Sequence, residues 1–341
     1  MTSGRGVMSF FAAAAMLFAR LPPGVAAQRA DPEFLWLSPS TFGTMNGVLR
    51  DLQTAADRGY RLVPLPPAGS LLLVQKTTEP SEPVEYTSAS AGKEMDEKAA
   101  VGYRLVSNFV MGRRKGSTAR THEYAKVATR LRQSMEDELR GAVKQGFRVV
   151  GLALQPIVGP RSFLVGVDDM EFVAILERSV EATQTAPLDY VVLSSLKVGT
   201  MQAELQAAAD RGYRLLPFEG AWGATVLLEK TSDVAPIEYL ALSTAKTATM
   251  QAEMEKASAA GYRFAATLGS GFREFVVVMQ RAKGVPARTH EQVLHAAARI
   301  GTLKRESLAE LEKGFRVVGL TSFAGFVRNP ETVVILERPA R

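Results

Sequence analysis

Apolar and polar positions follow a pattern that repeats six times along the chain. The fourth copy is the clearest, with an apolar run at 189–193, apolar residues at helical spacing in 200–211, and further runs at 212–218 and 225–230. Apolar residues three and four positions apart indicate a helix with one buried face. Short apolar runs bounded by turn residues are typical of strands. Each copy is therefore predicted to be a strand, a helix and two more strands.

A Gly-aromatic-Arg triplet opens the second predicted strand of every copy. The six triplets begin at Gly59, Gly102, Gly146, Gly212, Gly261 and Gly314. Each glycine stands where the preceding helix is expected to stop, and glycine is favoured in the left-handed position after a helix. The triplets therefore predict six small tandem βαββ modules of the α+β class.

Charged residues recur at three further places in the module. The first strand carries an acid, the triplet supplies an arginine, and a base closes the third strand; the acids are Glu33, Glu85, Glu123, Asp189, Glu238 and Glu291, and the closing bases are Lys76, Arg113, Arg178, Lys230, Arg281 and Arg338. Opposite charges on neighbouring strands stabilise a sheet. We expect structural ion pairs, and the alternative is a row of arginines that binds a ligand.

The third strands indicate how the modules associate. Segments such as 226–228, 275–279 and 333–336 are apolar at successive positions, so both faces of these strands are expected to be covered. The helix of a module covers only one face of its sheet. The other face is predicted to pack on another module, which argues against a string of independent units.

Two longer repeats place the modules in two sets of three. The sequence of 119–123 returns at 287–291, and that of 56–62 returns at 209–215. The expected domains are a first triplet at 28–180 and a second at 188–341, joined by a Thr-, Gln- and Pro-containing linker at 181–187. Their modules span about 33–76, 84–114 and 121–178, then 188–230, 237–281 and 289–338.

The module pattern resembles short bacterial domains of unknown function that usually occur singly. The shared features are the aromatic first strand, the Gly-aromatic-charged second strand and a third strand ending in Glu-Lys or Glu-Arg. The resemblance extends over 33–338 and implies the strand-helix-strand-strand unit, with no catalytic residue to transfer. Gln292 departs from it, because the other modules have Tyr or Phe there.

The N-terminus has the features of a cleaved secretory signal at 1–27. It combines Arg5, an apolar run at 7–19 and small residues before Gln28. The run is shorter than the ~20 residues of a membrane-spanning helix. Cleavage lowers the formal net charge from +6 to +4, and the chain has no cysteine. We expect an exported periplasmic or extracellular protein without disulfides and without a transmembrane anchor after cleavage.

Motifs for cofactors and catalysis are missing from the sequence. His290 and His295 are five residues apart, whereas the zinc-protease signature needs four, and the only other histidine is His122. Neither a phosphate-binding glycine loop nor a nucleophile elbow is present. We expect no metal, no cofactor and no enzymatic activity, with a site built from carboxylates alone as the remaining enzymatic alternative.

Two regions are candidates for binding. The long loops between the second and third strands of modules three and six carry residues suited to a protein partner: Ile157, Val158, Arg161, Phe163, Phe323 and Phe326. Two equivalent basic connectors are suited to a polyanion through Arg113, Arg114, Lys115, Arg120, Arg281, Lys283 and Arg288. The alternatives are apolar loop residues folded back on the sheets and solvated linkers. Aromatic residues do not alternate with the basic ones, which argues against nucleic acid.

The expected function is that of a non-enzymatic interaction module in the cell envelope. Its expected partner is another envelope protein or a second copy of the chain. The alternative is a protein that binds a small molecule or a polyanion at the interface between the two triplets, with help from the basic connectors.

Overall fold

The computed structural model describes thirteen segments of the chain: 33–38, 45–65, 71–77, 82–107, 109–129, 132–156, 170–181, 188–216, 225–230, 235–268, 274–284, 290–323 and 331–340. Contacts group Glu33–Arg341 into one compact unit. The predicted signal at 1–27 lies outside the described residues. Within the described segments, no helix has the length and hydrophobicity needed to cross a bilayer.

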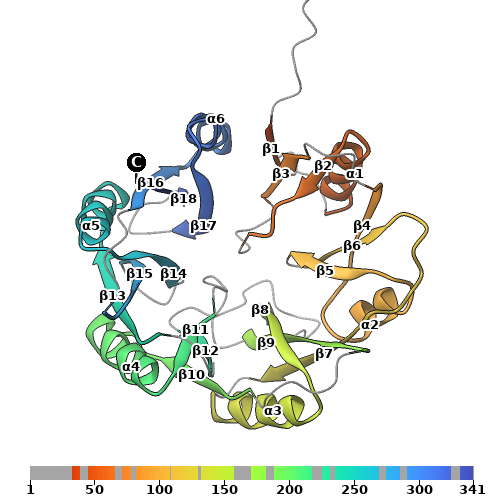
Figure 1. Ribbon diagram of the computed structural model, residues 1–341, viewed down its shortest axis with the longest axis horizontal. Coiled ribbons are helices and arrows are strands. Elements are labelled where there is room, and N and C mark those ends of the chain that lie inside the picture. Colours follow the sequence, from red (N-terminus) through yellow and green to blue (C-terminus); the bar gives the residue numbers. More distant parts are fainter. Residues whose placement is uncertain are drawn as a thin grey trace, which may run out of the picture. The chain divides into compact units, whose positions relative to one another are not determined.

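The elements follow the order strand, helix, strand, strand six times (Figure 1). Module one contains β1 (Phe34–Leu37), α1 (Met45–Asp57), β2 (Tyr60–Leu62) and β3 (Leu72–Lys76). Module two contains β4 (Val84–Ser88), α2 (Lys93–Ala99), β5 (Arg104–Ser107) and β6 (Val110–Arg114). Module three contains β7 (His122–Thr129), α3 (Arg132–Lys144), β8 (Arg148–Pro156) and β9 (Met170–Ser179).

The second half of the chain repeats this order. Module four contains β10 (Tyr190–Ser194), α4 (Val198–Asp210), β11 (Tyr213–Leu215) and β12 (Thr225–Lys230). Module five contains β13 (Ile237–Thr244), α5 (Thr247–Ala259), β14 (Arg263–Leu268) and β15 (Phe275–Ala282). Module six contains β16 (His290–Ala297), α6 (Ile300–Glu312), β17 (Arg316–Phe323) and β18 (Glu331–Pro339).

Each module forms a small antiparallel sheet with its third strand in the middle. The strand order is β1-β3-β2 in module one, and the other five sheets repeat it. The first and second strands are consequently both edge strands. The described residues thus confirm the mixed α+β class and its repeated three-stranded sheets.

The triplet glycines adopt the conformation predicted for them. Their φ angles range from 84° at Gly146 to 91° at Gly102 and Gly212. The backbone N–H of Gly212 donates to the carbonyl of Ala209 in the last turn of α4. Only glycine adopts this left-handed geometry without strain, so each glycine ends a helix and directs the chain into the next strand.

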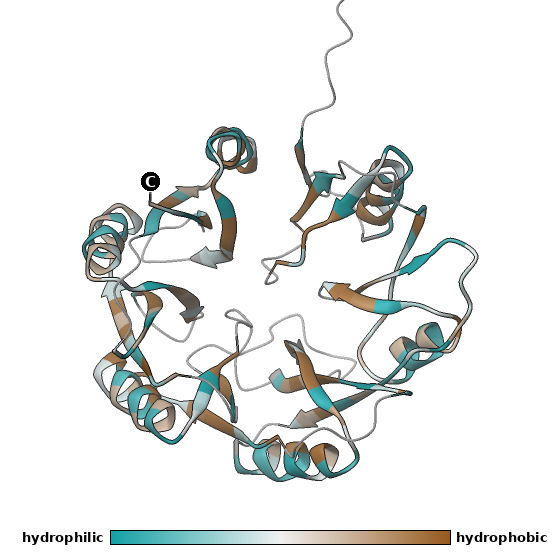
Figure 2. Ribbon diagram, viewed as in Figure 1, coloured by the Kyte–Doolittle hydropathy of each residue, from teal (hydrophilic) through white to brown (hydrophobic). Residues whose placement is uncertain are grey.

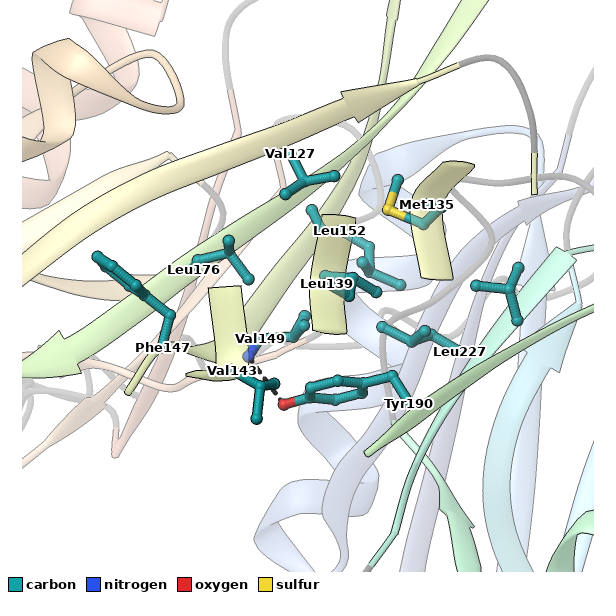
Figure 3. Close-up of a cluster of buried hydrophobic side chains, with 12 residues drawn as sticks. Val127, Met135, Leu139, Val143, Phe147, Val149, Leu152, Leu176, Tyr190 and Leu227 are labelled. Carbon is teal, nitrogen blue, oxygen red and sulfur yellow. Dashed lines mark hydrogen bonds between the residues drawn. The ribbon is translucent and has the colours of Figure 1, made fainter. Parts of the chain in front are cut away.

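Hydrophobic clusters form at the junctions between modules. One cluster joins Leu139 and Val149 of module three to Tyr190 and Leu227 of module four (Figure 3). It therefore continues across the expected boundary between the triplets. Five more clusters join modules one and two, two and three, four and five, five and six, and six and one. The contacts between modules thus form a closed cycle.

The central strands explain why successive positions are apolar. In β12, Leu227 belongs to the cluster shared with module three, whereas Val226 and Leu228 belong to the cluster shared with module five. Alternate residues of a strand point to opposite faces of the sheet. Figure 2 shows the resulting hydrophobic strands, beside helices that mix hydrophobic and hydrophilic residues. Each central strand thus contributes to two junctions.

Candidate functional site

The arginine that closes the third strand contacts three parts of its own module. In module two, Arg113 pairs with Glu85 at 2.8 Å, donates to the carbonyl of Val101 and stacks 4.4 Å from the centre of the Tyr103 ring. Arg178, Arg281 and Arg338 repeat all three contacts. The predicted pairing of acid and base is therefore confirmed in four modules. We call this set of contacts the arginine clamp.

Modules one and four have a lysine in place of the clamp arginine. Lys76 lies 5.0 Å from the centre of the Tyr60 ring and donates to the carbonyl of Arg58. Lys230 lies 5.8 Å from the centre of the Tyr213 ring. The Tyr213 hydroxyl donates to Asp189 at 2.5 Å. Burial and this hydrogen bond raise the pKa of Tyr213 to about 12.

Two triplet arginines cross a junction to reach a buried carboxylate. Arg104 pairs with Glu177 at 3.0 Å, and Arg148 pairs with Glu229 at 2.7 Å. The Glu229 side chain is only 2% exposed and also accepts from the Tyr190 hydroxyl at 2.8 Å. Burial raises the pKa of Tyr190 and keeps its hydroxyl protonated. A buried carboxylate needs such partners, so these contacts support a structural role.

The other triplet arginines differ in their contacts. Arg61 and Arg214 donate to backbone carbonyls, including those of Glu82 and Ala235 in the connectors that follow their modules. Arg316 pairs with Glu337 of its own module at 3.3 Å, whereas Arg263 is exposed. Five of the six arginines therefore have structural contacts, which weighs against a uniform row of ligand-binding arginines.

Polar side chains on the helices cover the edge of the next module's first strand. Gln202 of α4 donates to the carbonyl of Tyr239 at 2.6 Å and accepts from the N–H of Ala241 at 2.5 Å. Gln53 bonds in both directions to β4, and Gln251 does so to β16. The side-chain amide thus replaces a neighbouring strand. Such cover prevents pairing of the edge with another chain.

Sequence reasoning missed these helix residues, although their spacing carries a signal. Gln53, Asp96 and Gln206 stand six residues before the triplet glycine, whereas Glu136, Gln202 and Gln251 stand ten before it. Asp96 and Glu136 accept from the backbone of the next module's first strand. Alignment of the helices on their terminal glycines would have shown polar residues recurring at these two partly buried positions.

At four junctions, a tyrosine at the same register position of the first strand contacts the preceding module. Tyr86, Tyr124, Tyr190 and Tyr239 each accept a backbone N–H from the second strand of the preceding module. Figure 3 shows this bond between Tyr190 and Val149. Module six has Gln292 at this position; its Nε2 donates to Glu337, and its buried Oε1 has no partner among the described residues.

The basic connector residues lie beside acids. Arg113 and Arg281 belong to arginine clamps, and Arg114 pairs with Glu82 at 3.0 Å. Arg120 pairs with Asp96 at 2.7 Å, and Lys283 pairs with Asp210 at 2.9 Å. Lys115 is exposed. Arg288 lies outside the described residues. These pairs reduce the positive charge available to a polyanion.

Most of the candidate loop residues are not described. Ile157, Val158, Arg161, Phe163 and Phe326 lie outside the described residues. Phe323 is the last residue of β17, where its backbone pairs with Glu331 of β18. What the structure does show is the length of the supporting strands. β8 and β9 have nine and ten residues, whereas β2 and β11 have three each.

The histidines lie in separate places. His122 is 3.7 Å from Glu177, and burial lowers the pKa of His122. His295 is 3.6 Å from Glu306 of α6, and His290 pairs with Pro339 in the sheet register. The described segments contain no group of three or more His, Asp or Glu residues that could hold a metal ion.

The fold and these contacts define a mixed α+β protein built from repeated sheet units. Comparison of the chain with protein-family models, with curated proteins and with solved structures found no match. The functional argument therefore depends on the contacts described above.

Proposed function

We propose that the chain is an exported, non-enzymatic repeat protein that acts as an interaction module in the cell envelope. Its six βαββ modules form two duplicated sets of three and derive from a unit related to the short bacterial domains it resembles. The segment 1–27 is its secretory signal, and the mature protein is periplasmic or extracellular. The partner is another envelope protein or a second copy of the chain.

One observation carries the proposal for the binding surface. In modules three and six the second and third strands extend well past those of modules one and four, with eight residues in β17 and nine in β18. Extended hairpins on a rigid scaffold are common sites of recognition. Along the cycle of contacts, modules three and six are three steps apart in both directions. We assign partner binding to the segments between these strands, at 157–169 and 324–330, together with Phe323 at the end of β17.

The described charges support this proposal over the polyanion alternative. Five of the six described candidate basic residues have an acidic partner within 3.0 Å. A polyanion would have to compete with these ion pairs. Its binding would weaken steeply with salt, because ionic contacts at a surface are screened.

Crosslinking in intact cells tests the proposal. Tagged full-length protein is compared with a variant in which a short glycine turn replaces 157–169, and with a matched variant in which the same turn replaces 217–224 of module four. We expect one dominant crosslinked protein, retained by the module four variant and lost from the module three variant. Equal loss from both variants, or a salt-sensitive anionic partner that both retain, would contradict the assignment.

A further inference from the structure

The junction between modules six and one lacks the tyrosine contact found at four junctions and the arginine contact found at two. Phe34 stands at the register position of the junction tyrosines and has no hydroxyl to accept a backbone N–H. Gln75 stands where Glu177 and Glu229 receive an arginine from the preceding module. Arg316 accordingly pairs with Glu337 of its own module. Two contacts that cross other junctions are therefore replaced here.

The helix side of this junction also has different chemistry. Lys304 stands ten residues before Gly314, the place that Gln202 and Gln251 occupy in their helices. A lysine side chain donates hydrogen bonds but accepts none. Lys304 donates to the carbonyl of Trp36 and to the Ser38 hydroxyl, and burial lowers the pKa of its ammonium group. The N–H of Trp36 therefore has no amide acceptor like the one that Gln202 offers to Ala241.

The remaining contacts are largely apolar. Trp36 and Leu73 of module one pack with Leu303, Leu311 and Phe315 of module six, and the Trp36 indole donates to Ser307 at 2.9 Å. The chain connects these two modules only through the other four. Separation of this junction requires no change in any connector, unlike separation of the other five.

We propose that the junction between modules six and one is a seam at which the closed cycle opens while the other junctions stay formed. Local opening follows the lowest free-energy path, and this is the junction whose two modules no connector joins directly. Opening exposes Trp36 and the apolar side of α6 and separates module six from module one. The inference does not depend on what binds the loops of modules three and six.

The two tryptophans make the seam directly measurable. Trp222 lies outside the described residues. The substitution Trp222→Phe leaves Trp36 as the only tryptophan of the chain. We expect its emission to shift to longer wavelength at a lower urea concentration than the loss of far-ultraviolet circular dichroism. In the unsubstituted protein, amides of 34–37 should exchange at least about tenfold faster than those of 190–194. Coincident transitions together with equal exchange would overturn the proposal.

Substitutions at matched positions separate the seam from general instability. Lys304→Gln gives α6 the amide that α4 and α5 carry, and Phe34→Tyr adds a junction hydroxyl. We expect the double variant to slow hydrogen exchange of 34–37. Its fluorescence and circular dichroism transitions in urea should then coincide. Gln202→Lys is the matched control and should instead speed exchange at 237–244. Unchanged exchange at 34–37 in a folded Lys304→Gln protein would also contradict the seam.

Discussion

At the scale of single residues, the arginine clamp explains why an arginine closes four of the third strands. Its guanidinium forms an ion pair, satisfies a carbonyl before the triplet glycine and covers the aromatic ring of the triplet. Lysine supplies a point charge but not a planar group with donors in several directions. The clamp therefore ties the end of the helix to both outer strands.

Loss of one clamp should measurably destabilise the protein. Arg338→Met keeps an apolar stem and removes the pair with Glu291, the bond to Lys313 and the stacking on Phe315. We expect a loss of about 1–3 kcal/mol in the free energy of unfolding, measured with urea. Arg305→Met, at an exposed position of α6, is the control and should change it by less than about 0.5 kcal/mol. Equal effects would contradict the clamp.

The phenol of Tyr213 should ionise late. Its pKa of about 12 lies above the ordinary value of about 10, because burial and the bond to Asp189 favour the neutral form. Because the pKa is raised in the folded protein, the contribution of Tyr213 to the free energy of unfolding is fully present below pH 10. This contribution is lost as pH rises toward 12, because the unfolded chain loses the phenol proton first. Ultraviolet titration of wild type and Tyr213→Phe should differ near pH 12. A difference near pH 10 would contradict this assignment.

Substitution of Gln292 by tyrosine should strengthen the junction between modules five and six. Its side chain is shorter than the tyrosines at the same position, and its buried Oε1 lacks a partner among the described residues. Gln292→Tyr should place a hydroxyl near β14 and raise the free energy of unfolding by about 0.5–1.5 kcal/mol. Tyr239→Gln is the reciprocal change and should lower it. Thermal denaturation of both variants checks the prediction, and a destabilised Gln292→Tyr protein would indicate overpacking instead.

At the scale of elements, the helices act as covers for sheet edges as well as parts of the core. A three-stranded sheet with its third strand in the middle has two open edges. Helix side chains of the preceding module cover the first strand, and a tyrosine hydroxyl of the following module reaches the second. A single module therefore has unsatisfied backbone groups that its neighbours satisfy, which links the small sheets to one another.

The amide of Gln202 provides the test of this role. Gln202→Met has a similar length but leaves the carbonyl of Tyr239 and the N–H of Ala241 without this side chain. We expect a loss of about 1–3 kcal/mol in the free energy of unfolding and faster hydrogen exchange in β13. Gln133→Met, at an exposed position of α3, is the control. An effect of Gln202→Met no larger than that of Gln133→Met would exclude the covering role.

The sequence predicted most elements but few of the contacts between modules. The triplet glycines, the spacing of apolar residues and the bases that close the third strands are all short-range features of the sequence. They therefore predict helices and strands without knowledge of distant residues. The pair between Arg104 and Glu177 joins residues 73 positions apart, and the one between Arg148 and Glu229 joins residues 81 apart. Sequence spacing alone does not reveal which modules are neighbours. The closed cycle was likewise not predictable from any single module.

At the scale of the whole molecule, contacts in corresponding modules support the proposed duplication. Arg61 and Arg214 bind equivalent carbonyls, and modules one and four share lysine in place of the clamp arginine. The second strand has a register shift in modules two, three, five and six, and the shift precedes a glycine (Gly151 and Gly319) in modules three and six. Shared details of this kind are expected if three modules were duplicated as a set.

The cycle of contacts predicts how separated triplets behave. A fragment of 28–180 exposes the module three side of the cluster that includes Leu139, and a fragment of 188–341 exposes Tyr190 and Leu227. Exposed apolar faces of this kind drive association. We expect the two fragments to form a one-to-one complex, measured by light scattering after size-exclusion chromatography, and Leu139→Asp to weaken it. Two folded fragments that stay monomeric when mixed would show that each triplet is a complete domain and that the cycle is not required for stability.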